Sequence, residues 1–285
     1  MRLGGERQSQ NVEDMRGRGG GLRLGGSVGI GTVVVALVAS YLFGIDPSVI
    51  LEGTQQVNVE QAPSDGPPVP ADDEKAVFVA QVLATTEDTW SQIFRERGAQ
   101  YPPPKLVLFT GNFPTACGMG MSAAGPFYCP QDRKVYIDLQ FYQLMRDRFR
   151  AAGDFAQAYV IAHEVGHHIQ NVLGILQRLD QQRGRVSRQE YNALSVRVEL
   201  QADCLAGVWA KRTEARKRIL EPGDIDEALT AAAAIGDDTL QRQTQGRAVP
   251  DSFTHGTSAQ RTRWLKRGLD SGDIDACDTF ATAQL

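Results

Sequence analysis

One stretch of nine residues constrains the fold of this chain more than any other. Residues 162–170 read AHEVGHHIQ and hold three of the four histidines in the sequence. On an α-helix, residues four apart differ in direction by about 40°, so His163 and His167 would point to the same place. Apolar residues recur at spacings of three and four and predict a helix over residues 155–173, with Gly174 as its stop. The chain is therefore expected to form a helix with two imidazoles on one face.

The acid within this stretch fits a catalytic metal site. Glu164 would point about 100° away from His163 and about 60° away from His167, so its carboxylate lies beside a bound ion without binding it. In the H-E-x-x-H pattern, zinc polarises a carbonyl and lowers the pKa of its water while the glutamate transfers the proton. Gly166 costs about 1 kcal/mol relative to alanine within a helix, so we expect another segment to approach its backbone. The alternative is a chance pattern whose histidines only decorate a helix.

A second acidic pattern supplies the rest of a metal site. Residues 187–190 form a capping box, S-R-Q-E, which predicts the start of a second long helix. Glu199 on this helix would be a third ligand. Asp203, on the same face, would accept a hydrogen bond from a ligand histidine and fix its orientation. Two carboxylates among apolar neighbours are costly to bury without partners, so the two helices together predict one metal ion per chain.

The first quarter of the chain has the charge pattern of a membrane protein. Residues 1–23 are rich in glycine and carry five arginines against three acidic residues, which indicates a flexible tail. Residues 24–45 carry no charge, and about 20 apolar residues cross a bilayer as a helix. Residues 46–75 contain seven acidic residues and one lysine and resemble a Pro/Asp-rich linker. The positive-inside rule then predicts a cytoplasmic N-terminus, a single-pass anchor in a cell inner membrane, and a periplasmic or extracytoplasmic domain at residues 76–285.

Two other interpretations of residues 24–45 stay open. The segment could be a buried core helix, or a signal peptide cleaved near residues 38–40, whose sequence is V-A-S. The overall net charge of −4, without a basic face that contains aromatic residues, excludes a general nucleic-acid binder.

The cysteines support export. All four follow the predicted span, and an even number in an exported domain predicts two disulfides. Of the three possible pairings, we favour Cys117 with Cys129, which closes a short loop rich in glycine and proline, and therefore Cys204 with Cys277. A zinc site with cysteine ligands is the alternative, but the sequence has no C-x-x-C pair.

The remaining periodicity predicts an α+β domain that is mostly helical with a small sheet. We expect a helix near residues 76–97, strands at 105–109 and 134–138, and a helix that starts at Asp224 with Glu227 as its capping partner. Asp237 and Asp238 follow a helix-ending glycine, and a cap or a solvated turn is the default interpretation.

Several segments together resemble the membrane-anchored neutral zinc metallopeptidases, which are of the gluzincin type. Besides the apolar span, they read SQNVEDMRG, CGMGMSAAGPFYCPQDRKVYIDLQFY, AHEVGHHIQN, VELQADCLAGVWA, AIGDD and SFTHGTSAQRTRWLKRG. The resemblance implies a zincin-like fold with His163, His167 and Glu199 on Zn²⁺ and Glu164 as general base. It also implies that residues 134–140, KVYIDLQ, form a sheet edge along the cleft where a peptide substrate adds as a strand. An ordinary buried strand is the alternative. For Asp237 and Asp238, at the end of AIGDD, the resemblance adds a structural role near the site as the alternative to a cap or a solvated turn.

Two further histidines receive different interpretations. His255 is the only histidine far from the helix motif, and its imidazole could stabilise the oxyanion formed on the attacked carbonyl. A role in a turn is the alternative, and Tyr142 or Arg261 could do the same electrostatic work. His168 points away from His163 and is interpreted as a neighbour of the ligand shell or a surface residue.

The sequence thus predicts a membrane-anchored zinc peptidase that hydrolyses peptide or protein substrates outside the cytoplasm. The alternative is a zinc-binding tethered scaffold or adaptor of an envelope protein complex. Three protein ligands favour the enzyme, because structural zinc sites are usually closed by four. Residues 9–17, SQNVEDMRG, lie across the membrane from the chemistry in this prediction, and a cytoplasmic partner is a hypothesis for them.

Overall fold

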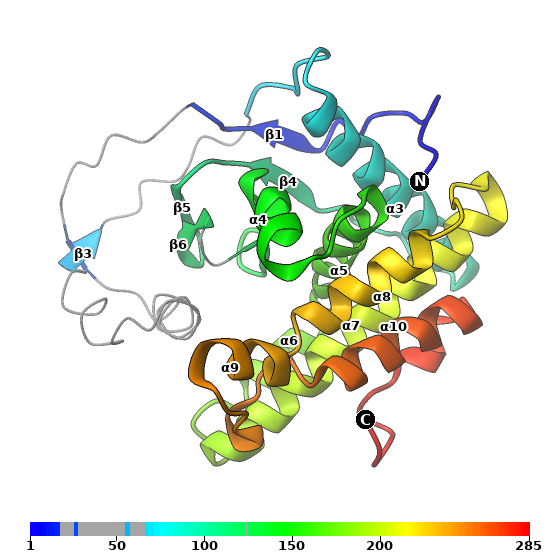
Figure 1. Cartoon of the computed structure of the whole chain (residues 1–285). Helices are drawn as coiled ribbons and strands as arrows, with labels where there is room; N and C mark the ends of the chain where they lie inside the picture. The colour runs from blue at the N-terminus through cyan, green and yellow to red at the C-terminus, as the bar shows by residue number, and fades with distance from the viewer. Residues whose placement is uncertain (18–25, 28–54, 58–65, 123–124) are drawn as a thin grey trace.

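A four-stranded sheet forms one side of the protein, and helices run beside one another on the other side (Figure 1). The computed structural model describes residues 1–17, 26–27, 55–57, 66–122 and 125–285. The sheet order is β1 (Val12–Asp14), β4 (Lys105–Leu108), β8 (Lys134–Ile137) and β7 (Phe127–Cys129). The first three strands are parallel and β7 is antiparallel to β8. The predicted α+β class with a small sheet is confirmed.

Five helices form most of the helical layer and carry the residues of interest. They are α3 (Glu74–Glu96), α5 (Asp154–Val172), α7 (Arg188–Lys217), α8 (Asp224–Ala234) and α10 (Ser258–Ser271). The shorter elements are of three kinds. Strands β2 (Gly26–Ser27) and β3 (Gln55–Val57) form an antiparallel pair, and β5 (Asn112–Thr115) and β6 (Gly118–Met121) form a hairpin. The remaining helices are α4 (Gln140–Phe149), α6 (Ile175–Asp180) and α9 (Asp237–Gln245), with the 3-10 turns η2 (Pro250–Ser252) and η3 (Ile274–Cys277).

The helices and strands predicted within residues 76–285 are confirmed, with two corrections of detail. The capping box of Ser187 and Glu190 starts α7 as expected. Helix α8 starts at Asp224, but Gly223 is its N-cap without a side-chain bond, and Glu227 instead accepts a hydrogen bond from the backbone N–H of Phe155 at 3.1 Å. Strand β8 lies between β4 and β7, so the expectation that residues 134–140 form a sheet edge is wrong and the alternative, an ordinary buried strand, holds for β8. The two edges of the sheet are β1 and β7.

Both faces of the sheet are covered, as a mainly parallel sheet requires. Because side chains alternate along a strand, Leu106 and Leu108 pack into the helical core with Trp90. Val107 and Phe109 face the other way and join a smaller cluster. That cluster also contains Met15, Phe113, Cys129 and Tyr136.

Helix α7 approaches its two neighbours closely at glycines. A Cβ atom on Gly166 would lie 3.0 Å from the carbonyl oxygen of Ala202, so α5 and α7 meet backbone to backbone. A Cβ atom on Gly268 of α10 would lie 1.9 Å from the carbonyl oxygen of Cys204. The expected close approach at Gly166 is therefore confirmed, and α7 is the segment that approaches.

The N-terminal segment is part of the folded domain, so the prediction of a flexible tail is wrong for residues 1–17. Val12 pairs with Leu106 in the parallel β1–β4 ladder. The buried carboxylate of Glu13 forms ion pairs with Lys105 at 2.8 Å and Lys134 at 2.7 Å. The Met1 amino group donates a hydrogen bond to Asp154 at 2.6 Å. These contacts give residues 9–17 a structural role within the domain itself.

This pairing bears directly on membrane topology. The backbone N–H of Asp14 donates to the carbonyl of Pro67 at 3.0 Å, so the chain returns beside the strand that it left. Hydrogen-bonded strands share one compartment, so residues 1–17 and 76–285 cannot lie on opposite sides of a membrane in this structure. The predicted span at residues 24–45 lies outside the described residues except for Gly26–Ser27, which form a strand. None of the helices in the described ranges is long and apolar enough to cross a bilayer.

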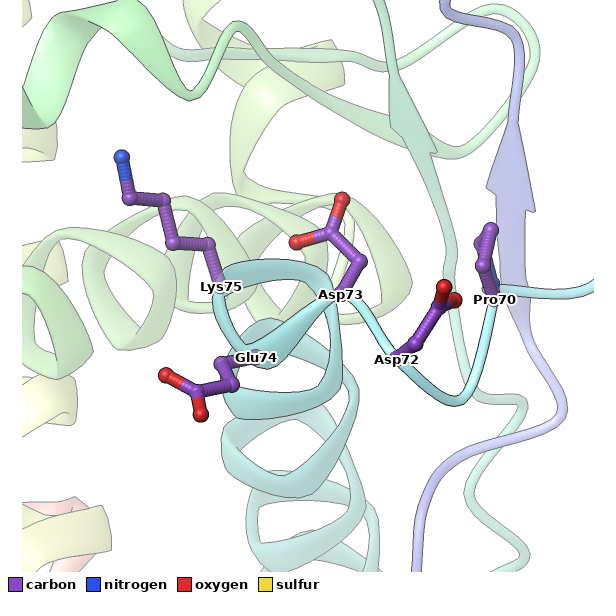
Figure 2. A pocket seen from close by; sticks show the side chains of 5 residues that line it. All are labelled: Pro70, Asp72, Asp73, Glu74 and Lys75. Carbon is purple, nitrogen blue, oxygen red and sulfur yellow. The ribbon is translucent and has the colours of Figure 1, made fainter.

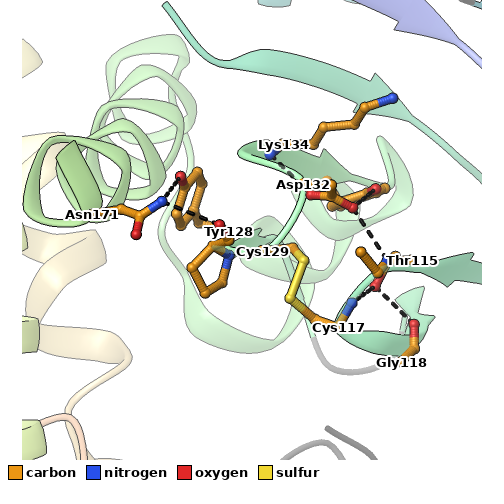
Figure 3. The surroundings of a disulfide bond; sticks show 11 residues. Thr115, Cys117, Gly118, Tyr128, Cys129, Asp132, Lys134 and Asn171 are labelled. Carbon is orange, nitrogen blue, oxygen red and sulfur yellow. Dashed lines mark hydrogen bonds between the residues drawn. A yellow bond between two sulfur atoms is a disulfide. The ribbon is translucent and has the colours of Figure 1, made fainter. Parts of the chain in front are cut away.

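Both predicted disulfides are confirmed. Cys117–Cys129 joins the β5–β6 hairpin to the edge strand β7, and the surrounding hydrogen bonds link this loop to Asn171 on α5 (Figure 3). Cys204–Cys277 joins α7 to the turn η3. Cross-links at these places constrain the unfolded chain, and each one fixes a segment that packs beside α5 or α7.

Candidate metal centre

Helices α5 and α7 bring three ligand side chains to one point. Nε2 of His163 lies 3.2 Å from Oε2 of Glu199, and Nε2 of His167 lies 3.5 Å from Oε1 of the same carboxylate. The three residues each offer a ligand atom, and these atoms all lie within 4.8 Å of one another. The arrangement arises because four residues make slightly more than one turn of α5 and because Gly166 lets α7 approach.

This geometry fits zinc. Zinc binds nitrogen and oxygen ligands at about 2.0–2.2 Å in a tetrahedron, which puts neighbouring ligand atoms about 3.3 Å apart. The separation of 3.2 Å between Nε2 of His163 and Oε2 of Glu199 agrees with that value. Two imidazoles and one carboxylate would hold the ion and leave a fourth position open, as in catalytic zinc sites.

Asp203 orients the imidazole of His163. Its Oδ1 accepts from Nδ1 of His163 at 2.8 Å and from the hydroxyl of Tyr159 at 2.6 Å, and the guanidinium of Arg261 donates to both carboxylate oxygens at 2.9 Å. Burial alone would raise the pKa of Asp203, but the charges of Arg261 and His163 hold it at about 2. An ionised Asp203 keeps the proton of His163 on Nδ1 and leaves Nε2 free to bind a metal.

Gln170 orients the second ligand and was not predicted from the sequence. Its Oε1 lies 2.8 Å from Nδ1 of His167, and its Nε2 donates to the carbonyl of Val198 at 2.7 Å and to Gln201 at 3.0 Å. Gln170 is three residues after His167, a spacing that puts the two side chains together on a helix. That spacing is the feature of the sequence that could have predicted the contact between Gln170 and His167.

Glu164 has the environment expected of a general base. Its side chain is 7% exposed, and burial raises its pKa although His167 and His163 oppose the shift. A raised pKa moves the carboxylate towards the working range of a proton carrier at neutral pH. By contrast, burial would raise the pKa of Glu199, but the charges of His167 and His255 hold it well below the usual value. A raised pKa suits Glu164 to proton transfer, and a lowered pKa suits Glu199 to binding a metal ion.

His255, in the loop before α10, lies close enough to Glu199 for their charges to interact. Partial burial would lower its pKa, but the charge of Glu199 and the hydrogen bond with Asp237 raise it. Oδ1 of Asp237 lies 3.3 Å from Nδ1 of His255, and Oδ2 accepts from the backbone N–H groups of Thr254, His255 and Gly256 at 2.7, 2.6 and 3.1 Å. Asp237 is 3% exposed, so it is not in a solvated turn and instead has the structural role near the site that the family resemblance implied as the alternative. No local pattern in the sequence predicts that Asp237 contacts a loop that lies 17 to 19 positions further along the chain.

The other two candidates for oxyanion stabilisation lie elsewhere. Tyr142 is buried in the helical core, and Arg261 is committed to Asp203. His168 is 0% exposed and lies between the hydroxyl of Tyr128 at 3.0 Å and the carbonyl of Pro102 at 2.6 Å, so it is not a surface residue. It connects α5 to the edge strand β7, and burial lowers its pKa to about 4.

Two other acidic regions of the described chain have structural explanations. Asp154, Asp224 and Glu227 form a second cluster, but the Met1 amino group lies 2.6 Å from Asp154 and 3.4 Å from Asp224. A shallow pocket at the start of α3 is lined by Pro70 and residues 72–75 (Figure 2). There Asp73 caps the helix at the N–H of Ala76 and pairs with Arg16. Neither region resembles the histidine-containing centre.

Comparisons with known proteins show the family of the chain. The family described as "Putative neutral zinc metallopeptidase" matches residues 1–280. "Uncharacterized protein YpfJ" of Escherichia coli K12 is 52% identical over 288 residues, which cover 98% of this chain and 99% of that protein. "Uncharacterized protein Rv2575" of Mycobacterium tuberculosis H37Rv is 41% identical over 218 residues, or 73% of each chain. No solved structure matches significantly. The chain belongs to the neutral zinc metallopeptidase family.

Proposed function

We propose that this protein is a zinc-dependent peptidase with one zinc ion per chain, bound by His163, His167 and Glu199. The observation that carries the proposal is the convergence of these three ligand atoms within 4.8 Å of one another, in a set that leaves one coordination position open. Glu164 follows the first ligand directly and has a raised pKa. Membership of a zinc metallopeptidase family supports peptide or protein substrates.

The chain's own residues supply proton transfer and orientation. When bound, zinc supplies a Lewis acid that polarises a carbonyl and lowers the pKa of water. Glu164 would accept the proton of the attacking water and pass it to the leaving amine. Asp203 and Gln170 hold the two ligand imidazoles in place during this exchange.

His255 is the proposed oxyanion stabiliser. Its raised pKa favours a charged imidazole, and Asp237 holds Nδ1, which leaves Nε2 for the substrate. A positioned donor of this kind stabilises the charge that develops on the attacked carbonyl. His255→Ala should therefore lower kcat by about 100-fold or more, with zinc content unchanged.

The edge strand β7 is the proposed place for an extended substrate. It ends the sheet nearest to α5, and Tyr128 within it contacts His168 and Asn171 on that helix. A peptide that adds to this edge as a further strand would run past the ligand helix. Pro substitutions along the substrate at alternate positions should reveal the pairing, because proline cannot donate to the ladder.

An oxidising compartment outside the cytoplasm is the proposed location, because two disulfides persist there. Residues 24–45 are the proposed membrane attachment, from their lack of charge, as a segment that enters the membrane and leaves it on the same side, because the β1–β4 pairing keeps residues 1–17 with residues 76–285. The β1–β4 pairing supports a location of residues 1–17 in the same compartment as the metal centre. A membrane-impermeant maleimide tests this on cells that produce Gln10→Cys or Ala283→Cys. Both should label before lysis; a cysteine at residue 10 that labels only after lysis would contradict the shared compartment.

The decisive test of function is cleavage of a mixed peptide library, followed by mass spectrometry. The full chain is required, because β1 belongs to the sheet. Zinc-loaded wild type and Glu164→Gln are compared at equal zinc content. Cuts made only by the wild type support the proposal and give its subsite preferences. A zinc-loaded wild type that makes no cuts overturns the peptidase and favours a tethered zinc-binding scaffold.

A further inference from the structure

A buried arginine stands directly behind the metal ligands. Arg261 is 2% exposed, although an unpaired charge in a protein interior is costly. It is buried because it shares one face of α10 with Trp264, Leu265 and Gly268, at spacings of three, four and seven. The sequence therefore puts a cation on the face of a helix that packs against α7.

The guanidinium joins three parts of the fold. Nε donates to Oδ2 of Asp203 and Nη2 to Oδ1, both at 2.9 Å, in a two-point contact with α7. Nη2 also lies 3.2 Å from the hydroxyl of Tyr159 on α5, and Nη1 lies 3.4 Å from the carbonyl of Ile235 after α8. A planar fork of this kind fixes a carboxylate in both position and rotation, which a lysine cannot do.

Asp203 carries the interaction between this arginine and His163, because the direct approach of Nη2 to Nδ1 of His163, at 3.5 Å, brings two donors together when Nδ1 holds the proton. Oδ1 of Asp203 accepts a hydrogen bond from Nη2 of Arg261 and lies 2.8 Å from Nδ1 of His163. Nε2 of the same ring faces Glu199 at 3.2 Å. A rotation of the Asp203 carboxylate would therefore turn the His163 ring and move Nε2 away from the ligand triangle.

We propose that Arg261 is a positioning residue of the metal centre: its two-point contact fixes Asp203, and Asp203 fixes the His163 ring for zinc. The proposal rests on the metal site of the proposed function but does not require that the protein be a peptidase. The proposal gives Arg261 no direct role in catalysis, since its guanidinium already donates hydrogen bonds to Asp203, Tyr159 and Ile235.

The test compares Arg261→Met and Arg261→Lys with Arg212→Met in the full chain. Arg212 is a matched control, because it also joins α7 to the α10 region, through a 2.7 Å bond to the carbonyl of Gly272, without touching Asp203. Zinc affinity is measured by competition with a chromophoric chelator, and the visible spectrum of the cobalt-substituted protein reports ligand geometry. Arg261→Met should lose about 10- to 100-fold in zinc affinity and change the cobalt spectrum. Arg212→Met should keep both even if it melts at a lower temperature.

Asp203→Asn shows whether the effect passes through Asp203. If it does, Arg261→Met should weaken zinc binding much less in an Asp203→Asn background than in the wild type. Equal losses in the two backgrounds would overturn the proposal. If Arg261→Met does not fold, the zinc affinity of Arg261→Lys is the test, since this variant keeps the charge but not the two-point contact with Asp203. Wild-type zinc affinity in Arg261→Lys would also overturn the proposal. A wild type that binds no zinc would instead refute the metal centre itself.

Discussion

The metal centre and the N-terminal segment lie in the same domain, but the first depends on patterns within single helices and the second on a contact between distant parts of the chain. The centre comes from two short patterns, each within a single helix, and helical spacing alone brings His163 beside His167 and Glu199 beside Asp203. The N-terminal segment reaches its place through a parallel pairing of Val12 with Leu106, 94 positions along the chain. Local periodicity predicts the first kind of structure, whereas only the whole fold reveals the second.

The largest expected effect is the removal of a ligand. Glu199→Ala should lower zinc affinity by well over 100-fold, more than the loss of a residue that only orients a ligand. Metal content after dialysis against a weak chelator measures it. Glu190→Ala, on the exposed start of the same helix, is the control and should retain zinc. Stoichiometric zinc in Glu199→Ala would remove this residue from the site.

A charge placed in β1 should destabilise the whole domain. Val12 is 4% exposed in the main core, so Val12→Asp should cost about 4 kcal/mol of unfolding free energy through lost apolar burial and an unpaired charge. Urea denaturation of the full chain measures this. Gln10→Asp, an exposed neighbour, should change stability by less than about 0.5 kcal/mol. Equal stability of the two variants would mean that residues 1–17 are dispensable for the fold.

The pH dependence of stability should reveal the buried His168. Its pKa is lowered to about 4 in the folded protein against about 6.5 in the unfolded chain, so between these values the unfolded state binds more protons. Stability should then fall as the pH drops from about 6.5 to about 4, by about 3 kcal/mol from this group. His168→Gln, compared with the wild type by urea denaturation at each pH, should lack that part of the slope. Identical slopes would show that His168 does not stay neutral in the folded state.

The smallest expected effect is at the start of α7. Ser187→Ala removes the capping box with Glu190 and should cost about 1 kcal/mol. Because this end lies three turns from Glu199, zinc affinity should be unchanged. Thermal unfolding and a zinc titration of the same sample measure both. A parallel loss of zinc would mean that the helix start and the metal centre are coupled.

The residues that sequence reasoning missed or misread share one property. Asp237 binds the loop of His255, Arg261 binds Asp203, and Glu13 pairs with two lysines of neighbouring strands. Each acts on a residue that is distant along the chain or belongs to another element. The convergence of His163, His167 and Glu199, the long helices and the disulfide pairing needed only spacing, capping and loop length, so they could be predicted.

The central claim is that three ligands hold one zinc while Glu164 stays free for chemistry. The most direct test is a zinc titration of the metal-free full chain that follows both bound zinc and the cleavage of one peptide found in the library. The account predicts that activity rises with zinc and levels off at one equivalent, and that Glu164→Gln binds the same equivalent without cleaving. Equal cleavage by Glu164→Gln, or activity that ignores zinc, would contradict it.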